Sequence, residues 1–283
     1  MGERGRRPAG RGEGGRRGAR RPHGLLTVAA GRTHRHAGAD ADPIAGVVRT
    51  MTARLDALMP EQDHLGRFLA TYQRTTLAVG SALADGLFED PSWVARWDVA
   101  FAEIYLEALD AYLSGGSPPR PWRLAFDAPR NLPPLGHVLL GVNAHVNYDL
   151  PHALLAVLSD ADFADAALMA SRRRDHERID SVLAGRVAAE DDELGPHGRS
   201  RTDRLLQPVH RLSAKRFLRE ARTKVWHNTV ELQAARRAGP AAYAARLSEL
   251  EVLSAARVAD VLAPGQVLLK LAVAGFGVTL PPL

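Results

Sequence analysis

The sequence is notable first for what it lacks. It contains no cysteine, which excludes disulfide bonds and metal sites built on thiolates. It has no run of about 18 apolar residues, so we expect no membrane-spanning helix. No segment alternates apolar and polar residues over the length of a half-buried strand. The dinucleotide fingerprint GxGxxG, the phosphate-binding loop, HExxH and the nucleophile elbow are also missing. With 46% hydrophobic and 24% charged residues, the composition is that of a soluble globular protein.

Lysine is scarce, and the net positive charge of the chain comes from its first 50 residues. Residues 1–50 hold 11 arginines, four acids and 11 of the 25 glycines, while the remainder carries slightly more acid than base. A segment with so few apolar residues buries too little surface to fold, so we expect residues 1–50 to be a disordered tail. The tail suits phosphate contacts with a nucleic acid, the only nucleic-acid binding that we expect. Alternatively, translation starts at Met51.

From residue 51 to 283 we expect one all-α domain, a bundle of helices separated by Pro/Gly breaks. The apolar residues recur at spacings of three and four. A Pro-rich segment, 117–134, is expected to be a surface connector, and 190–198 a loop. The expected helices cover 64–87, 91–114, 135–158, 160–189, 201–237 with a break at Pro208, 240–262 and 266–274.

One of these segments, LGHVLLGVNAHVNYDLPHALLAVL, combines an apolar helix with metal-ligand side chains. At about 100° per residue, His137, His145, Asp149 and His152 fall on one arc of about 120°. The i, i+4 spacing of His145 and Asp149 lets an imidazole nitrogen and a carboxylate oxygen reach one divalent ion. Gly141 is expected to leave room beside them. The spacing therefore predicts a metal site, with zinc the most plausible ion because the ligands are nitrogen and oxygen.

The same spacing has a purely structural interpretation. A histidine and an aspartate at i, i+4 also form an ordinary hydrogen-bonded pair, and a buried His/Asn/Asp network fixes the register of a helix. Three further groups are candidates to complete a metal site: Asp98, at the edge of an apolar stripe, and the His227 and Glu231 pair. An arginine-rich, solvated face is the alternative for that pair, and His176 in RRRDHERID is expected to be exposed.

Two resemblances add to this picture. PSWVARWDVAFAEIYLEAL, PRPWRLAFDA and LGHVLLGVNAHVNYDLPHAL resemble an actinobacterial family known as domain of unknown function 5995, which implies a helical domain and no established activity. The pairs His145 with Asp149 and His227 with Glu231 are similar, in order, to the HxxxD and HxxxE ligand pairs of zinc-dependent phospholipase C and single-strand zinc nucleases.

The second resemblance implies that Asp98 and His137 stand for the earlier carboxylate and imidazole ligands. The chain departs from those enzymes in its Arg-rich start, where they use an N-terminal tryptophan as a ligand, and in the position of His152, only three residues after Asp149.

Two functions follow as hypotheses. The first is a metal-dependent hydrolase in which a zinc-bound water attacks a phosphoester or ester of a small-molecule substrate. The second is a non-enzymatic helical protein that binds a partner or an apolar small molecule, or serves a structural role, with the His/Asn/Asp network holding its helices in register. For want of an export signal we expect a cytoplasmic location.

Overall fold

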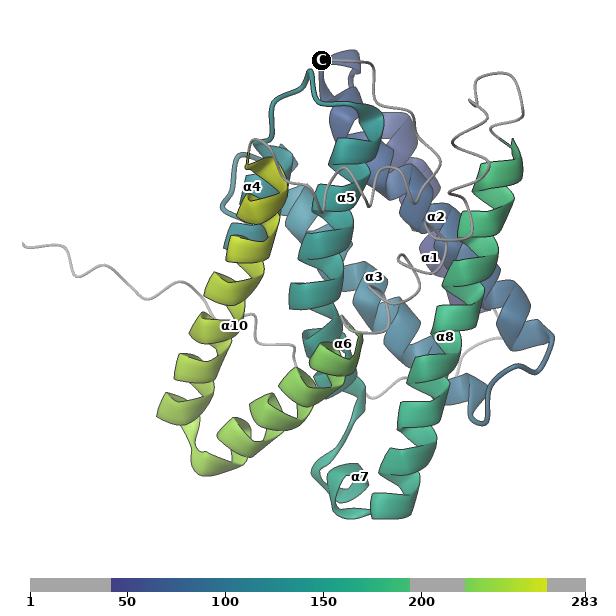
Figure 1. Cartoon of the computed structure of the whole chain (residues 1–283), viewed down its shortest axis with the longest axis vertical. Coiled ribbons are helices and arrows are strands. Elements are labelled where there is room, and N and C mark those ends of the chain that lie inside the picture. Colours follow the sequence, from purple (N-terminus) through teal and green to yellow (C-terminus); the bar gives the residue numbers. More distant parts are fainter. Residues whose placement is uncertain (1–41, 194–221, 264–283) are drawn as a thin grey trace, which may run out of the picture. The chain divides into compact units, whose positions relative to one another are not determined.

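The first helix begins before the boundary expected from composition. The structure, a computed structural model, describes residues 42–193 and 222–263 (Figure 1). Helix α1 spans Pro43–Ala57, and the side chain of Asp42 accepts a hydrogen bond from the Ile44 N–H at its start. Met51, where we expected the domain to begin, lies inside this helix and is fully buried. The predicted tail therefore includes the first two turns of α1.

The other elements follow in chain order. A short 3-10 turn (Pro60–Gln62) leads into α2. Next come α2 (Asp63–Ala84), α3 (Pro91–Leu113), α4 (Arg120–Phe126), α5 (Pro134–Ala144), a π-helical turn (His145–Asp149), α6 (Leu150–Val157), α7 (Asp160–Ala164), α8 (Ala166–Glu193) and α10 (Pro240–Leu262). Residues 222–238 are also helical. The all-α prediction is confirmed: residues 42–193 and 222–263 contain helices and no strand.

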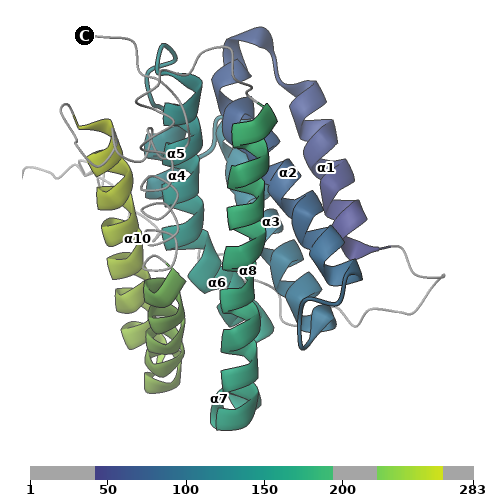
Figure 2. The same cartoon turned by 45° about the vertical axis from the view of Figure 1, so that its right-hand side comes forward.

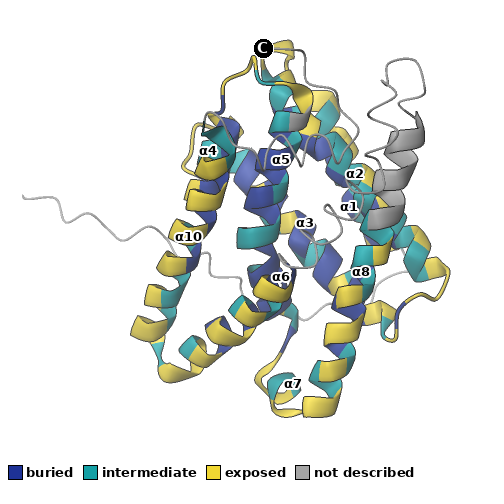
Figure 3. Ribbon diagram, in the orientation of Figure 1, coloured by how far each residue is buried: buried dark blue, intermediate teal, exposed yellow. Residues whose placement is uncertain are grey.

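The helices pack around a core to which α2, α3 and α6 contribute. Helix α1 packs against α2 and α3, α2 against α5 and α8, and α3 against α6, while α10 covers α4 and α5 (Figures 1 and 2). The apolar stripe predicted on α3 is buried: Trp93, Trp97 and Phe101 belong to one hydrophobic cluster. Figure 3 shows the buried residues gathered along α3, α5 and α6 and the exposed ones on α7, α8 and α10. The core therefore surrounds the segment on which we predicted the site.

The Pro-rich connector is the main correction to the predicted elements. It contains helix α4, which starts with Pro121 in its first turn, where a missing N–H costs nothing. Trp122 and Phe126 lie one turn apart on its inner face and are buried, Trp122 completely. The expectation of a surface loop was wrong because prolines that begin a helix were interpreted as prolines that prevent one.

The second half of the chain follows the prediction in part. Helix α10 covers the expected range, and the helix expected over 160–189 is divided at Asp165 into α7 and α8. Helix α8 continues to Glu193, so residues 190–193 of the expected loop are helical. Residues 194–198 lie outside the described residues. The disordered tail over residues 1–41, the break at Pro208 and the helix over 266–274 lie outside the described residues.

No helix within the described ranges is both long and apolar enough to cross a bilayer.

Candidate functional site

The segment that carries His145 and Asp149 is a π-helical turn inserted between α5 and α6. The N–H of Leu150 bonds to the carbonyl of His145, five residues before it. Pro151 follows directly and has no N–H to donate, which weakens the ordinary α-helical ladder here. The Asn147 amide donates to the Asn143 carbonyl at 2.8 Å, and the Asn143 amide to the Leu139 carbonyl at 2.9 Å. The two asparagines thus serve their own helix, and π turns of this kind are frequent at functional sites.

Inside this turn, His145 and Asp149 form a buried pair with Trp122 of α4. His145 Nδ1 lies 2.8 Å from Asp149 Oδ2, and Trp122 Nε1 donates to both carboxylate oxygens, at 3.0 and 2.8 Å. All three side chains are buried. The contact joins two elements that are 27 residues apart, so this pair fixes the position of α4 against the π turn.

The imidazole of His145 is enclosed by aromatic rings. Its plane is stacked on Phe101 of α3, with ring centroids 3.5 Å apart and an interplanar angle of 7°. Tyr72 of α2 meets it edge-on at 4.3 Å. Phe68, Tyr105 and Trp122 complete the enclosure at 5.6 to 6.0 Å. Aromatic packing therefore fixes the plane of the His145 ring, and the contact of Nδ1 with Asp149 fixes the orientation of the ring within that plane.

The space expected beside Gly141 is occupied. A Cβ at Gly141 would lie 2.3 Å from Phe68 Cγ, so the ring of Phe68 packs directly against the helix backbone. The glycine is needed for this close approach of α2 to α5 and does not leave room for a ligand. The earlier expectation was wrong because the residue that fills the space is distant in the sequence.

Several polar atoms around His145 are buried without a partner. Among the described residues none hydrogen-bonds to His145 Nε2, Tyr72 Oη, Tyr105 Oη or Asp98 Oδ2. Tyr72 Oη and Thr76 Oγ1 are neighbours that form no hydrogen bond of ordinary geometry. We call His145, Asp149, Tyr72, Tyr105 and Asp98 the core cluster. Its members come from α2, α3 and the π turn.

Burial governs the protonation of this cluster. It raises the pKa of Asp98 to about 7. It raises the pKa of Asp149, against the opposing hydrogen bond from Trp122, and lowers the pKa of His145. In the uncharged pair that these shifts favour, the Asp149 carboxyl donates to Nδ1, and Nε2 carries the ring proton.

Tyr72 lies close enough to both carboxyl groups of the cluster for each of them to affect its pKa. Burial first, and then the nearby carboxylates of Asp98 and Asp149, raise the pKa of Tyr72 well above its ordinary value. The same causes, burial followed by Asp149, raise the pKa of Tyr105. Apart from His145, the core cluster thus consists of carboxyl groups and phenols, and no arginine or lysine of the described residues is among the main causes of their pKa shifts.

The structure separates the remaining predicted site residues from this cluster. His137 lies on α5 beside His64 of α2, with ring centroids 5.4 Å apart. His227 and Glu231 are exposed, and their closest nitrogen and oxygen are 4.0 Å apart. Within residues 42–193 and 222–263, no three His, Asp or Glu side chains are placed to hold one metal ion. The six-residue metal site thus stays a prediction.

The expectation that His176 is exposed was wrong. It is 1% exposed, and its ring packs against Trp226 and Trp97, with centroids 5.5 and 6.4 Å away. Its arginine and glutamate neighbours suggested a solvated position. On α8 those neighbours point to other faces, and Asp175 and Arg178 instead hold the loop before α3.

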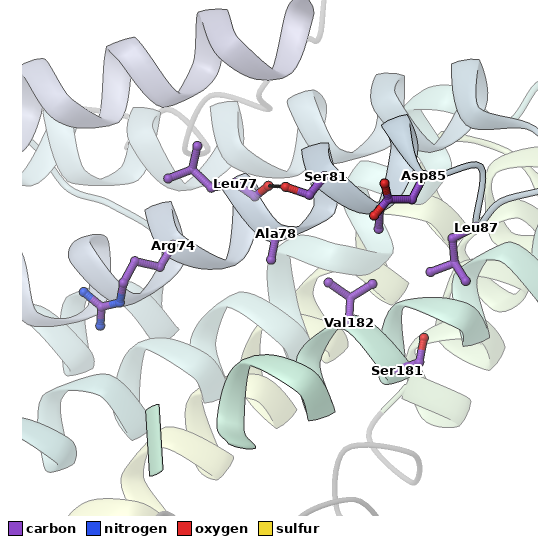
Figure 4. A pocket seen from close by; sticks show the side chains of 9 residues that line it. Arg74, Leu77, Ala78, Ser81, Asp85, Leu87, Ser181 and Val182 are labelled. Atoms are coloured by element: carbon purple, nitrogen blue, oxygen red, sulfur yellow. Dashed lines mark hydrogen bonds between the residues drawn. The ribbon is translucent and has the colours of Figure 1, made fainter. Parts of the chain in front are cut away.

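A surface groove lies apart from the core cluster. It has a volume of about 570 Å³ and is lined by Arg74, Leu77, Ala78, Ser81, Ala82, Asp85 and Leu87 from α2 and the loop that follows it, and by Ser181 and Val182 from α8 (Figure 4). None of the predicted site residues lines it.

Sequence reasoning missed Trp122, Tyr72 and Tyr105 as members of the site. A signal existed for Trp122, because Trp122 and Phe126 have the spacing of one helix face, preceded by a proline. Tyr72 and Tyr105 occupy ordinary core positions on their helices, and only the packing of α2 and α3 against the π turn brings their rings to His145.

The comparisons with known proteins identify a family without a known activity. No curated protein and no solved structure matches the chain. A family model described as a family of unknown function (DUF5995) matches residues 44–264, which include α1 except its first residue and every member of the core cluster. The chain therefore belongs to the DUF5995 family, a family of unknown function.

Proposed function

We propose that this protein binds a small polar molecule within its helical core, at the core cluster. The observation that carries the proposal is that the core cluster holds four buried polar atoms, His145 Nε2 among them, for which the described residues offer no hydrogen-bond partner. Buried polar groups in folded proteins nearly always have a hydrogen-bond partner, and those that lack one mark the place of a water, an ion or a ligand.

The free-energy cost of these unpaired buried atoms is large compared with the stability of a domain. Leaving one buried donor or acceptor unsatisfied costs about 1–3 kcal/mol, so four such atoms cost roughly 4–12 kcal/mol. A folded domain is stable by only about 5–15 kcal/mol. A molecule that bonds to these atoms therefore contributes a substantial part of the stability, and the bound form is the favoured one.

The test is to look for the molecule itself. The full chain is purified without affinity elution by small molecules and denatured, and the released compounds are identified by mass spectrometry. We expect a stoichiometric compound from the wild-type protein and much less from a Tyr72→Phe, Tyr105→Phe double variant. Tyr112→Phe serves as the control, because the Tyr112 hydroxyl donates to Asp127 near the surface. Equal recovery from the wild type and the double variant, or none from a wild type that folds normally, would refute the proposal.

Metal-dependent hydrolysis is the second candidate. The observation in its favour is that Asp149 contacts Nδ1 of His145 while Nε2 has no partner among the described residues. A metal at Nε2 requires the other tautomer, in which the ring proton lies on Nδ1 and is donated to an ionised Asp149. A zinc ion at Nε2 would need further ligands and would activate a water for attack on an ester. Elemental analysis of the full chain tests it: one or two equivalents of zinc, lost in His145→Ala, would support it, and a metal-free folded protein would exclude it.

A further inference from the structure

Helix α4 is held from two sides, by α10 and by the π turn. At the start of α4, the Arg120 N–H donates a hydrogen bond to the Glu251 carboxylate of α10 at 2.8 Å. Two residues later, the Trp122 indole donates to the Asp149 carboxylate, which also contacts His145. A continuous series of contacts therefore runs from α10 through α4 to the His145–Asp149 pair.

Helix α4 depends on this support. It has seven residues, and a helix shorter than about 12 residues is marginal in water without tertiary packing. The first N–H groups of a helix have no partner within it, so the Glu251 carboxylate is a cap supplied by another element. Glu251 also lies close enough to Tyr148 of the π turn to raise the pKa of its phenol, after the larger effect of burial. Helix α10 thus packs over both α4 and the π turn (Figure 1).

Helix α10 is itself weakly anchored. Four of its 23 residues are buried, whereas ten are buried in α3, which has the same length. The largest of the four, Leu250, belongs to a small cluster with Leu155 and Leu232 that is separate from the main core. Elements with few buried apolar contacts open at a lower free energy than the rest of a domain.

We propose that α10 and α4 form a gate over the His145–Asp149 pair, and that the gate opens as one unit while the rest of the core stays folded. Release of α10 removes the Glu251 cap, α4 leaves the core, and Trp122 gives up its hydrogen bonds to Asp149. Trp122 is also one of the rings around His145, with centroids 6.0 Å apart, so its departure exposes the imidazole to solvent. The gate does not depend on what binds at the core cluster, and its test uses the protein without added ligand.

Hydrogen exchange of the full chain, followed by mass spectrometry under conditions of rapid reclosing, tests the gate. We expect the amides of α4 and α10 to exchange together, about tenfold or more faster than the slowest amides of α3. Leu250→Ala removes a buried side chain of α10 and should speed exchange in both gate helices by about tenfold or more. Val79→Ala, at a buried position of α2 outside the gate, should speed exchange in α3 and leave α4 and α10 unchanged.

The hydrogen bond between the two gate helices has its own test. Glu251→Ala should speed exchange in α4 by about tenfold, because it removes a charge-assisted hydrogen bond. Glu249→Ala is the matched control on the same helix. Glu249 pairs with Arg246 within α10, so this variant should leave exchange in α4 unchanged.

Exposure of His145 is measured by its reaction with diethyl pyrocarbonate, located by mass spectrometry. Leu250→Ala should speed this reaction by the same factor as exchange in α4. His227 is exposed while the gate is closed and should react equally in the variant and the wild type.

Three results would overturn the inference: exchange in α4 only together with the slowest amides of α3, an equal effect of Val79→Ala on α4 and α3, or no faster reaction of His145 in Leu250→Ala. If a variant does not fold, exchange of the wild type in low concentrations of urea decides the matter. The amides of α4 and α10 should then share one dependence on urea, shallower than that of α3, and an equally steep dependence would contradict the gate.

Discussion

Removal of the Asp149 carboxylate is the perturbation whose cost the structure defines best. In Asp149→Ala the indole N–H of Trp122 and Nδ1 of His145 lose their shared partner inside the core. Each orphaned group costs about 1–3 kcal/mol, and the cavity left by the side chain adds to this. We therefore expect a loss of about 3–5 kcal/mol in the free energy of unfolding.

Asp149→Asn should be much milder. Its carboxamide oxygen still accepts from Trp122, and its N–H₂ group donates to Nδ1 once the imidazole carries its proton on Nε2. We expect a loss of about 1 kcal/mol. The free energy of unfolding of both variants is measured by urea unfolding followed by circular dichroism. The control is Asp110→Ala, which breaks a half-exposed ion pair with Arg54 and should cost less than about 1 kcal/mol. Similar costs for the alanine and asparagine variants would refute the reasoning.

Three other predictions concern the same core and its borders. Because burial raises the pKa of Asp98 to about 7, the free energy of unfolding of the ligand-free protein should be highest below pH 4 and fall by roughly 4 kcal/mol as the pH rises to 7. Unfolding curves of Asp98→Asn measured over the same pH range should not show this fall. Gly141→Ala should cost about 1–3 kcal/mol by displacing Phe68, whereas Gly136→Ala, with only ordinary contacts on the same helix, should be neutral or slightly stabilising, as thermal unfolding will show. Asp175→Ala should cost about 2–4 kcal/mol, since its carboxylate accepts two backbone N–H groups of the loop before α3; an unchanged denaturation midpoint would contradict this.

Helical periodicity was sufficient to predict most of the described fold. The range of α10 and the start of α3 at Asp90 and Pro91 followed from apolar spacing and capping residues. Helix α4 was missed because proline was treated only as a helix breaker. The start of α1 was missed because composition was averaged over a segment whose last residues differ from the rest.

The site was harder to predict than the fold. The i, i+4 spacing of His145 and Asp149 predicted either two ligands of one metal ion or a hydrogen-bonded pair, and the two side chains lie within hydrogen-bond distance of each other. The predicted arc assumed regular α-helical rotation, whereas the chain makes a π turn at these two residues. The groups that meet His145 from outside, Trp122 and Tyr72, depend on tertiary packing that no local pattern contains.

The measurement that tests the central claim most directly is the effect of Tyr105→Phe on the free energy of unfolding of the full chain. This substitution removes one buried hydroxyl and leaves the ring in place. If a bound molecule bonds to that hydroxyl, the variant should be less stable by about 1 kcal/mol or more. A variant that is more stable than the wild type would show that the hydroxyl has no partner, and would contradict the proposal that the core cluster holds a ligand.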